Sequence, residues 1–269
     1  QTFHAFLSIC DTLKKSGGCF GLIFRPPCKR VIIMDRYPRS NGSIVERANT
    51  GIQAYMAQVY GWMFCGLLLT AFVAWYASGS EKIMSFVFSS QITFFGLIIA
   101  QLALVFVISG MVNRLSGTVA TGLFMLYSAL TGLTLSSIFL VYTGDSIFGT
   151  FIVAAGMFGA MSVYGYVTKR DLTGIGSMLF MALIGLVLAS LVNMWLKSSG
   201  LANIISYAGV LIFVGLTAYD TQKLKNMGAQ LSADDRDNFR KYSIVGALTL
   251  YLDFINLFLM LLRIFGNRR

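Results

Sequence analysis

The segment Tyr251-Leu-Asp-Phe-Ile-Asn-Leu-Phe258 decides the fold, because it places an acidic side chain inside a long apolar run. The run covers residues 243–265, and about 20 apolar residues are enough for a helix to cross a bilayer. A carboxylate at that depth is costly unless it is paired, protonated or in contact with water, so Asp253 is a candidate functional residue. At helical spacing, Thr249 and Asn256 lie on the same face and form a polar stripe with Asp253.

The composition of the chain is typical of a membrane protein. Of its 269 residues, 56% are hydrophobic and 12% are charged, whereas a soluble domain carries about 25% charged residues. The sequence therefore predicts an all-α protein with several membrane spans. The net charge of +10 does not indicate nucleic-acid binding, because most basic residues lie in short segments between apolar runs. The four cysteines match no zinc or redox spacing, so we expect neither a metal site nor a disulfide framework among them.

Seven apolar runs predict seven transmembrane helices. They cover residues 54–77, 84–111, 118–142, 146–167, 174–196, 201–220 and 243–265. The second run is long enough to be tilted, unless its true ends lie inside these limits. Small residues at four-residue spacing predict close helix packing, and they occur in the sets Ser128/Gly132/Ser136, Gly156/Ala160 and Gly185/Ala189. The longest connection, residues 221–242, is predicted to be a solvated loop or a short surface helix.

The chain divides into three parts. Residues 1–33 hold three of the four cysteines and the only histidine, and we interpret them as a non-native or upstream extension. Residues 34–53 are predicted to form a cytoplasmic N-terminal tail, and residues 54–269 a seven-helix transmembrane domain. With the N-terminus inside, most Lys and Arg residues of the connections lie on the inner side, as the positive-inside rule requires. The basic C-terminal tail opposes this orientation, and it would fit if the seventh run were re-entrant.

Three charged residues near one side of the membrane form the candidate site. Asp220 ends the sixth run, Arg114 closes the second, and Asp253 lies deeper in the seventh run from the same side. Two carboxyl groups in a low-dielectric site cannot both ionise readily, so we predict that they share a proton and titrate as a unit. Simpler interpretations stay open. Asp253 would then be a packing residue hydrogen-bonded to a neighbouring helix, Asp220 a solvated interfacial residue, and Arg114 a topology marker.

These residues carry a resemblance to a known family. The segment 251–258, together with Leu261-Leu-Arg-Ile-Phe265 and Ala218-Tyr-Asp-Thr-Gln222, resembles the Bax inhibitor family, the transmembrane Bax inhibitor motif proteins. Met34-Asp-Arg-Tyr-Pro-Arg-Ser40 and Tyr55-Met-Ala-Gln-Val-Tyr-Gly-Trp-Met63 resemble its bacterial inner-membrane branch. The resemblance covers residues 34–269 and implies a multi-pass protein of the bacterial inner membrane.

The resemblance also implies an architecture and a function. The expected fold is a seven-transmembrane-helix bundle with the last helix central, and the expected function is a pH-sensitive calcium leak channel. The paired aspartates of the family correspond to Asp220 and Asp253, which would also be the calcium ligands, and its latch arginine corresponds to Arg114. One departure is Gln101 in the second span, where some relatives carry an acid that would form a second cation site. The implied partners are the lipid bilayer, calcium ions and protons, with no cofactor beyond calcium and no nucleic acid.

Other classes of function fit the sequence less well. No histidine lies in any span, and no protease motif surrounds the aspartates, which argues against an intramembrane protease. The seventh span has no lysine for a Schiff base. We therefore expect no enzymatic activity. The alternative is an interaction protein, because family members are described as regulators of cell death in eukaryotes and of a membrane-bound quality-control protease in bacteria. That reading places the function in the tail, residues 34–49.

Overall fold

A computed structural model describes residues 41–88, 90–231 and 235–268 of the chain. In this part of the chain the regular structure is helical, and seven helices are long and apolar enough to cross a membrane. The predicted fold class, an all-α membrane protein with seven transmembrane helices, is thereby confirmed. The predictions for residues 1–33 and for the first part of the N-terminal tail, up to residue 40, lie outside the described residues.

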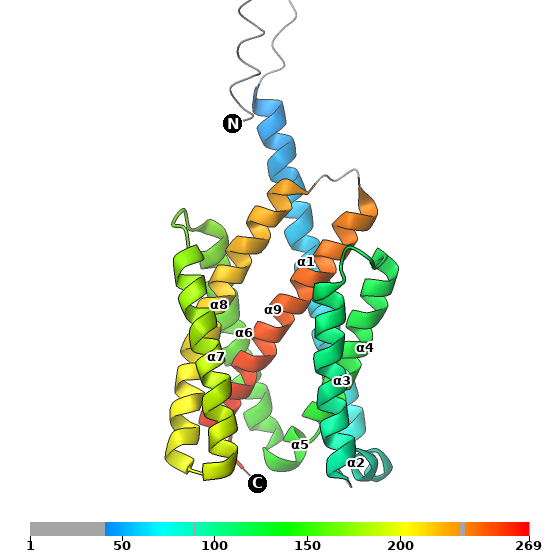
Figure 1. The fold of residues 1–269 in the computed structure, drawn as a ribbon, viewed down its shortest axis with the longest axis vertical. Helices are drawn as coiled ribbons and strands as arrows, with labels where there is room; N and C mark the ends of the chain where they lie inside the picture. The colour runs from blue at the N-terminus through cyan, green and yellow to red at the C-terminus, as the bar shows by residue number, and fades with distance from the viewer. Residues whose placement is uncertain (1–40, 89, 232–234, 269) are drawn as a thin grey trace, which may run out of the picture. The chain divides into compact units, whose positions relative to one another are not determined.

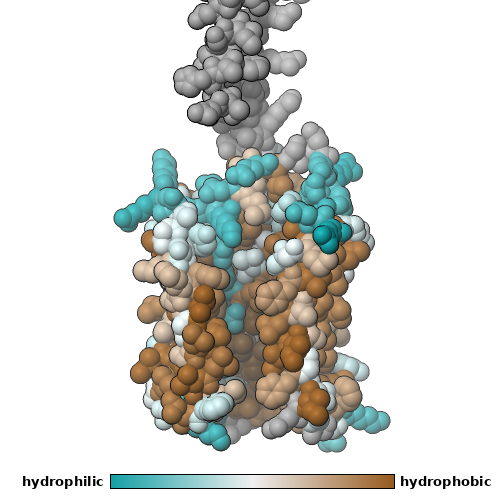
Figure 2. All heavy atoms as spheres, viewed as in Figure 1, coloured by the Kyte–Doolittle hydropathy of each residue, from teal (hydrophilic) through white to brown (hydrophobic). Residues whose placement is uncertain are grey.

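The helices follow one another along the chain with short connections (Figure 1). They are α1 (Asn41–Ser78), α2 (Glu81–Phe88), α3 (Gln91–Gly110), α4 (Gly117–Leu135), α5 (Ile138–Val141), α6 (Gly144–Val167), α7 (Thr173–Leu196), α8 (Ser199–Gln230) and α9 (Arg236–Phe265). The short helices α2 and α5 lie in connections at the same end of the bundle. We call the opposite end, which carries the α3–α4, α6–α7 and α8–α9 connections, the inner end after its predicted orientation. Figure 2 shows an apolar belt below hydrophilic side chains at that end.

The last helix, α9, lies at the centre of the bundle. Of its most apolar 18-residue window, 61% is buried, against 44% for α8, the next most buried. Around it pack α1, α3, α4, α6 and α8. At the inner end, Asp237 Oδ1 accepts a hydrogen bond of 2.8 Å from the Gly117 N–H at the start of α4. At the other end, Thr143 N–H donates to Asn267 O at 3.2 Å. Helix α9 therefore runs the whole length of the bundle, which contradicts the re-entrant alternative.

Two predicted spans have different boundaries in the structure. The second predicted run includes the end of α2 and all of α3, and the hydroxyl of Ser90 accepts a hydrogen bond from Ile92 N–H at the start of α3. An N-cap of this kind favours a new helix start. The prediction of a solvated loop or short surface helix at residues 221–242 is wrong, because α8 continues to Gln230 and α9 begins at Arg236. Hydropathy detects the part of a helix that suits lipid, whereas these two helices extend beyond it with polar residues.

The N-terminal helix is also longer than its apolar run. Helix α1 begins at Asn41, so residues 41–53 of the predicted tail are helical and continuous with the first span. Its 38 residues correspond to roughly 57 Å at 1.5 Å per residue, well beyond the ~30 Å hydrocarbon core of a bilayer.

The small residues pack closely at one of the three predicted places. A Cβ atom on Gly132 would lie 2.7 Å from Thr70 O of α1, so α4 and α1 are in backbone contact there. Gly156 and Gly185 have no atom within 4 Å of such a Cβ, and the prediction of close packing at these two is wrong. The spacing of small residues identifies a smooth helix face but not whether a neighbour covers it.

Candidate functional site

Two carboxyl groups meet in the interior of the bundle, one on α8 and one on α9. The Asp220 and Asp253 side chains interact with each other and line the same pocket. Helix α8 continues ten residues beyond Asp220, to Gln230, so Asp220 lies within the helix and not at its end. Asp253 is 6% exposed, and its Oδ2 atom has no hydrogen-bond partner among the described residues. Two ionised carboxylates have no donor to offer each other, so a hydrogen bond between these side chains would need one proton on the pair, and the shared proton stays a prediction.

The acidic pair faces a pocket of about 750 Å³ between α7, α8 and α9. Thr249 and Asn256 line the same pocket, so the polar stripe of α9 faces this space together with Asp253. The Thr249 hydroxyl donates to Val245 O at 3.1 Å, and Asn256 Nδ2 donates to Leu252 O at 2.8 Å. Each side chain keeps an oxygen that can accept a hydrogen bond or contact a cation. In Figure 2, hydrophilic atoms continue from the hydrophilic end down into a recess between two apolar walls.

The pocket continues toward the inner end and closes in the other direction. A second, more polar pocket of about 260 Å³ shares Thr173, Tyr219 and Lys223 with the first and reaches Gln230. On the far side of Asn256, Met260 packs onto Gly209, where a Cβ atom would lie 2.9 Å from Met260 Cγ. The polar route therefore joins the acids to the inner end and stops at an apolar contact between α8 and α9.

The basic residue beside the acids is Lys223, which was not among the candidate residues predicted from the sequence. Lys223 follows Asp220 by three residues on α8, which puts both on one helix face, and the two side chains interact electrostatically. Arg114 lies exposed in the α3–α4 turn and forms no ion pair within the described part of the chain. Its neighbour Asn113 accepts a hydrogen bond of 3.2 Å from the Tyr242 hydroxyl of α9. The structure thus places Arg114 beside the start of α9, apart from the acidic pair, and its latch role stays a prediction.

The α6–α7 connection at the mouth of the route is fixed by a glutamine and an aspartate. Gln222 Oε1 accepts a hydrogen bond from Leu172 N–H at 2.9 Å, and its Nε2 donates to Arg170 O at 2.8 Å. The hydroxyl and N–H of Thr173 donate to Asp171, and these bonds hold the pKa of Asp171 below its usual range. Asp171 therefore stays ionised at neutral and mildly acidic pH, so it cannot be a sensor in that range.

Replacing Gln222 by Glu is expected to loosen this connection. A glutamate can still accept from Leu172 N–H, but it presents an oxygen in place of the donor to Arg170 O, and the free energy of unfolding should fall by about 1–2 kcal/mol. Limited trypsin digestion in detergent should then cut faster after Lys169 and Arg170. Asn226→Asp, an exposed change of the same kind on the same helix, is the control. Equal cutting rates in the two variants would contradict the assignment.

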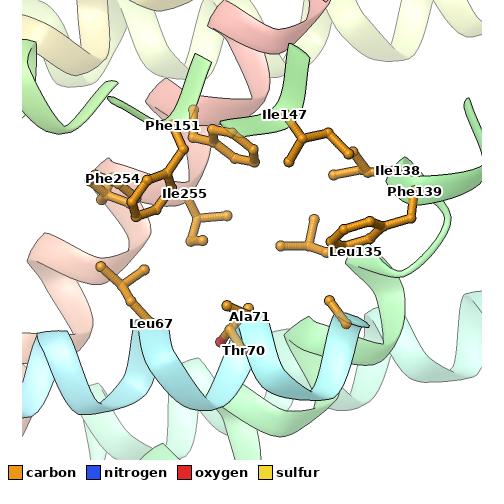
Figure 3. A pocket seen from close by; sticks show the side chains of 12 residues that line it. Leu67, Thr70, Ala71, Leu135, Ile138, Phe139, Ile147, Phe151, Phe254 and Ile255 are labelled. Atoms are coloured by element: carbon orange, nitrogen blue, oxygen red, sulfur yellow. The ribbon is translucent and has the colours of Figure 1, made fainter. Parts of the chain in front are cut away.

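A separate cavity of about 100 Å³ lies on the other side of α9, between α1, α4, α5 and α6. Figure 3 shows its walls, which are aliphatic and aromatic side chains apart from Thr70. The Thr70 hydroxyl contacts Ser128 O at 2.9 Å and the Tyr251 hydroxyl at 2.6 Å, so it is already occupied. With no free oxygen to replace a hydration shell, this cavity is unsuited to a cation. Helix α9 thus turns its acidic side to the polar route and its aromatic side to an apolar cavity.

The fold and site define a polytopic α-helical membrane protein with a pair of carboxyl groups, one buried and one half-buried, at the end of a polar route. The chain belongs to the Bax inhibitor family, since the family model described as "Inhibitor of apoptosis-promoting Bax1" matches residues 52–269. It is 70% identical over 236 residues to the inner membrane protein YbhL of Escherichia coli, which covers 88% of this chain and all of that protein. An uncharacterized protein of Borreliella burgdorferi is 51% identical over 215 residues, covering 80% of this chain and 92% of that protein. These similarities confirm the family resemblance predicted from the sequence.

Proposed function

We propose that this protein is a pH-sensitive calcium leak channel of the bacterial inner membrane, gated by a proton shared between Asp220 and Asp253. The observation that carries the proposal is the pair formed by the buried Asp253 and the half-buried Asp220, at the end of a polar route that opens at one end of the bundle. The inner-membrane location is supported by the seven apolar helices of this chain and by the similarity to the inner membrane protein of Escherichia coli. The predicted orientation places the N-terminus and the open end of the route in the cytoplasm.

The donor set suits a passing calcium ion. Calcium takes six to eight oxygen ligands, and the route offers two carboxylates with the Thr249 and Asn256 oxygens nearby. The part of the chain that the structure describes holds no group of three or more His, Cys, Asp or Glu side chains that could hold a metal ion. A calcium ion at the acidic pair would therefore keep part of its water shell and bind weakly, and weak binding is what conduction requires.

The gating step follows from the charge on the pair. With one shared proton, the acids hydrogen-bond and hold α8 and α9 together at Asp220 and Asp253. When that proton is lost, two like charges lie side by side at low dielectric, and their repulsion favours separation of the helices and entry of a cation. Separation would also loosen the contact of Met260 with Gly209, which closes the route. Arg114 lies in the α3–α4 turn, which is hydrogen-bonded to α9 through Asn113 and Tyr242. It is the proposed latch that stabilises the closed state at the inner end.

Calcium uptake into proteoliposomes containing the purified protein, followed from acidic to mildly alkaline pH, tests this function. Uptake should be low at acidic pH and rise as the shared proton leaves. Protein-free liposomes carry the same pH gradient and report the background leak. If folded protein shows no uptake above this background at any pH, the channel function is wrong.

A second candidate function is regulation of a membrane-bound quality-control protease or of a stress response. It is favoured by the length of α1, whose first turns extend beyond the apolar run. Deleting residues 34–49 should then abolish control of the partner and leave calcium uptake unchanged, whereas substitutions of the two aspartates should do the reverse. The partner would be captured from native membranes with the full-length chain and lost with the shortened one.

A further inference from the structure

One cation lies along the polar route, and its position is unexpected for a route that carries cations. Lys223 lines both the pocket that holds the acids and the pocket that leads to the inner end. Among the described residues that line these two pockets, it is the only Lys or Arg. An ion moving through these two pockets between the inner end and the acids passes its ammonium group.

The ammonium group is close to the acids but is not paired with them. Lys223 interacts electrostatically with Asp220 without forming an ion pair, and its Nζ lies 6.0 Å from the centre of the Tyr219 ring. An aromatic face attracts a cation at about this distance, so a cation–π contact with Tyr219 holds the ammonium at the wall of the route. The flexible four-carbon stem of lysine allows the ammonium to move from this position toward the carboxylate one turn away.

We propose that Lys223 is a tethered cation that competes with calcium for the carboxyl pair. The inference rests on the proposed function, because it takes calcium as the ion of the route. When the pair is doubly ionised and no calcium is present, the Lys223 ammonium leaves Tyr219 and neutralises Asp220. Calcium must displace it, and this sets the calcium concentration at which the site fills. Lys223 is thus a specificity-determining residue that disfavours occupancy at low calcium.

Removal of the ammonium should strengthen calcium binding. A unit charge within several ångströms of the site, at the effective dielectric of a protein surface, changes the affinity for a divalent cation by roughly tenfold or more. Lys223→Met keeps most of the stem and loses the charge, whereas Lys223→Arg keeps the charge. Lys169→Met is the matched control, because Lys169 is exposed near the same end of the bundle and lines neither pocket.

Equilibrium calcium binding to the purified full-length protein, measured by titration calorimetry at mildly alkaline pH, tests the proposal. The half-saturating calcium concentration should be roughly tenfold lower in Lys223→Met than in Lys169→Met, with Lys223→Arg close to wild type. Equal values for the two methionine variants, or no calcium binding by Lys223→Met, would overturn the role of Lys223.

Uptake into proteoliposomes by the same proteins separates this inference from the channel function. If Lys223→Met binds calcium more tightly but no protein takes up calcium, Lys223 competes with calcium and the channel function is wrong. If the wild-type protein takes up calcium but Lys223→Met binds calcium with unchanged affinity, the role of Lys223 is wrong and the channel function stands. Lys223→Gln is a second neutral variant, which can be used if Lys223→Met does not fold. The elution profile of each protein in size-exclusion chromatography in detergent reports whether it is folded.

Discussion

Replacing Asp253 by Asn is expected to abolish the pH dependence of calcium uptake. An amide has nearly the shape of a carboxyl group but keeps its N–H donors at every pH, so it can donate to Asp220 as the protonated acid does. The contact between α8 and α9 would then persist where the wild-type pair loses its proton. Uptake should be low and flat from acidic to alkaline pH, whereas a one-proton gate allows the wild-type rate to change by up to about tenfold per pH unit.

Asp220→Asn should give the same flat profile, since the proton belongs to the pair and not to either residue. The control is Asp171→Asn, which changes an exposed carboxylate at the same end of the bundle. Its side-chain oxygen can still accept the bonds from Thr173, and Asp171 is already ionised across the range of the experiment. This variant should keep the wild-type pH response. A wild-type profile in both Asp220→Asn and Asp253→Asn would refute the proton gate.

The sequence was sufficient to identify the acids because a charge deep in an apolar run stands out against its surroundings. Asp253 could be selected from its depth, and the period of the helix added Thr249 and Asn256, which the structure places in the same pocket. The depth of Asp220 was harder to predict. The apolar run ends there, and the polar residues that continue α8 to Gln230 resemble a loop in hydropathy. Only the packed structure shows that the two acids face the same pocket.

Contacts between side chains of different helices could mostly not be predicted from the sequence. Lys223 looked like one of several basic residues at the inner side, although its three-residue spacing from Asp220 was a usable signal. Arg114 was selected through the family resemblance, and its contacts depend on how the α3–α4 turn folds against α9, which no local pattern encodes. The same holds for glycines. Gly165 belongs to none of the sets of small residues that the sequence indicated, yet it makes a closer helix contact than Gly156 or Gly185.

Gly165→Ala is therefore expected to disturb both the stability and the gate. A Cβ atom at this position would overlap Ala218 O, a backbone atom of α8 that cannot rotate away. Helix α6 would have to move from α8 two residues before Asp220. Overpacking of this kind costs about 1–3 kcal/mol, so the apparent melting temperature in detergent should fall.

The matched variant is Gly159→Ala, in the same helix, where the added Cβ would meet no atom within 4 Å. Because alanine is favoured over glycine inside a helix, this protein should melt at or above the wild-type temperature. Equal melting temperatures for the two variants would show that α6 and α8 are not in close contact. Where the Gly165→Ala protein stays folded, the shift of α8 should also weaken the proposed hydrogen bond between Asp220 and Asp253. Its calcium uptake should then begin at a more acidic pH than in wild type, since a pair held less tightly releases its shared proton more readily.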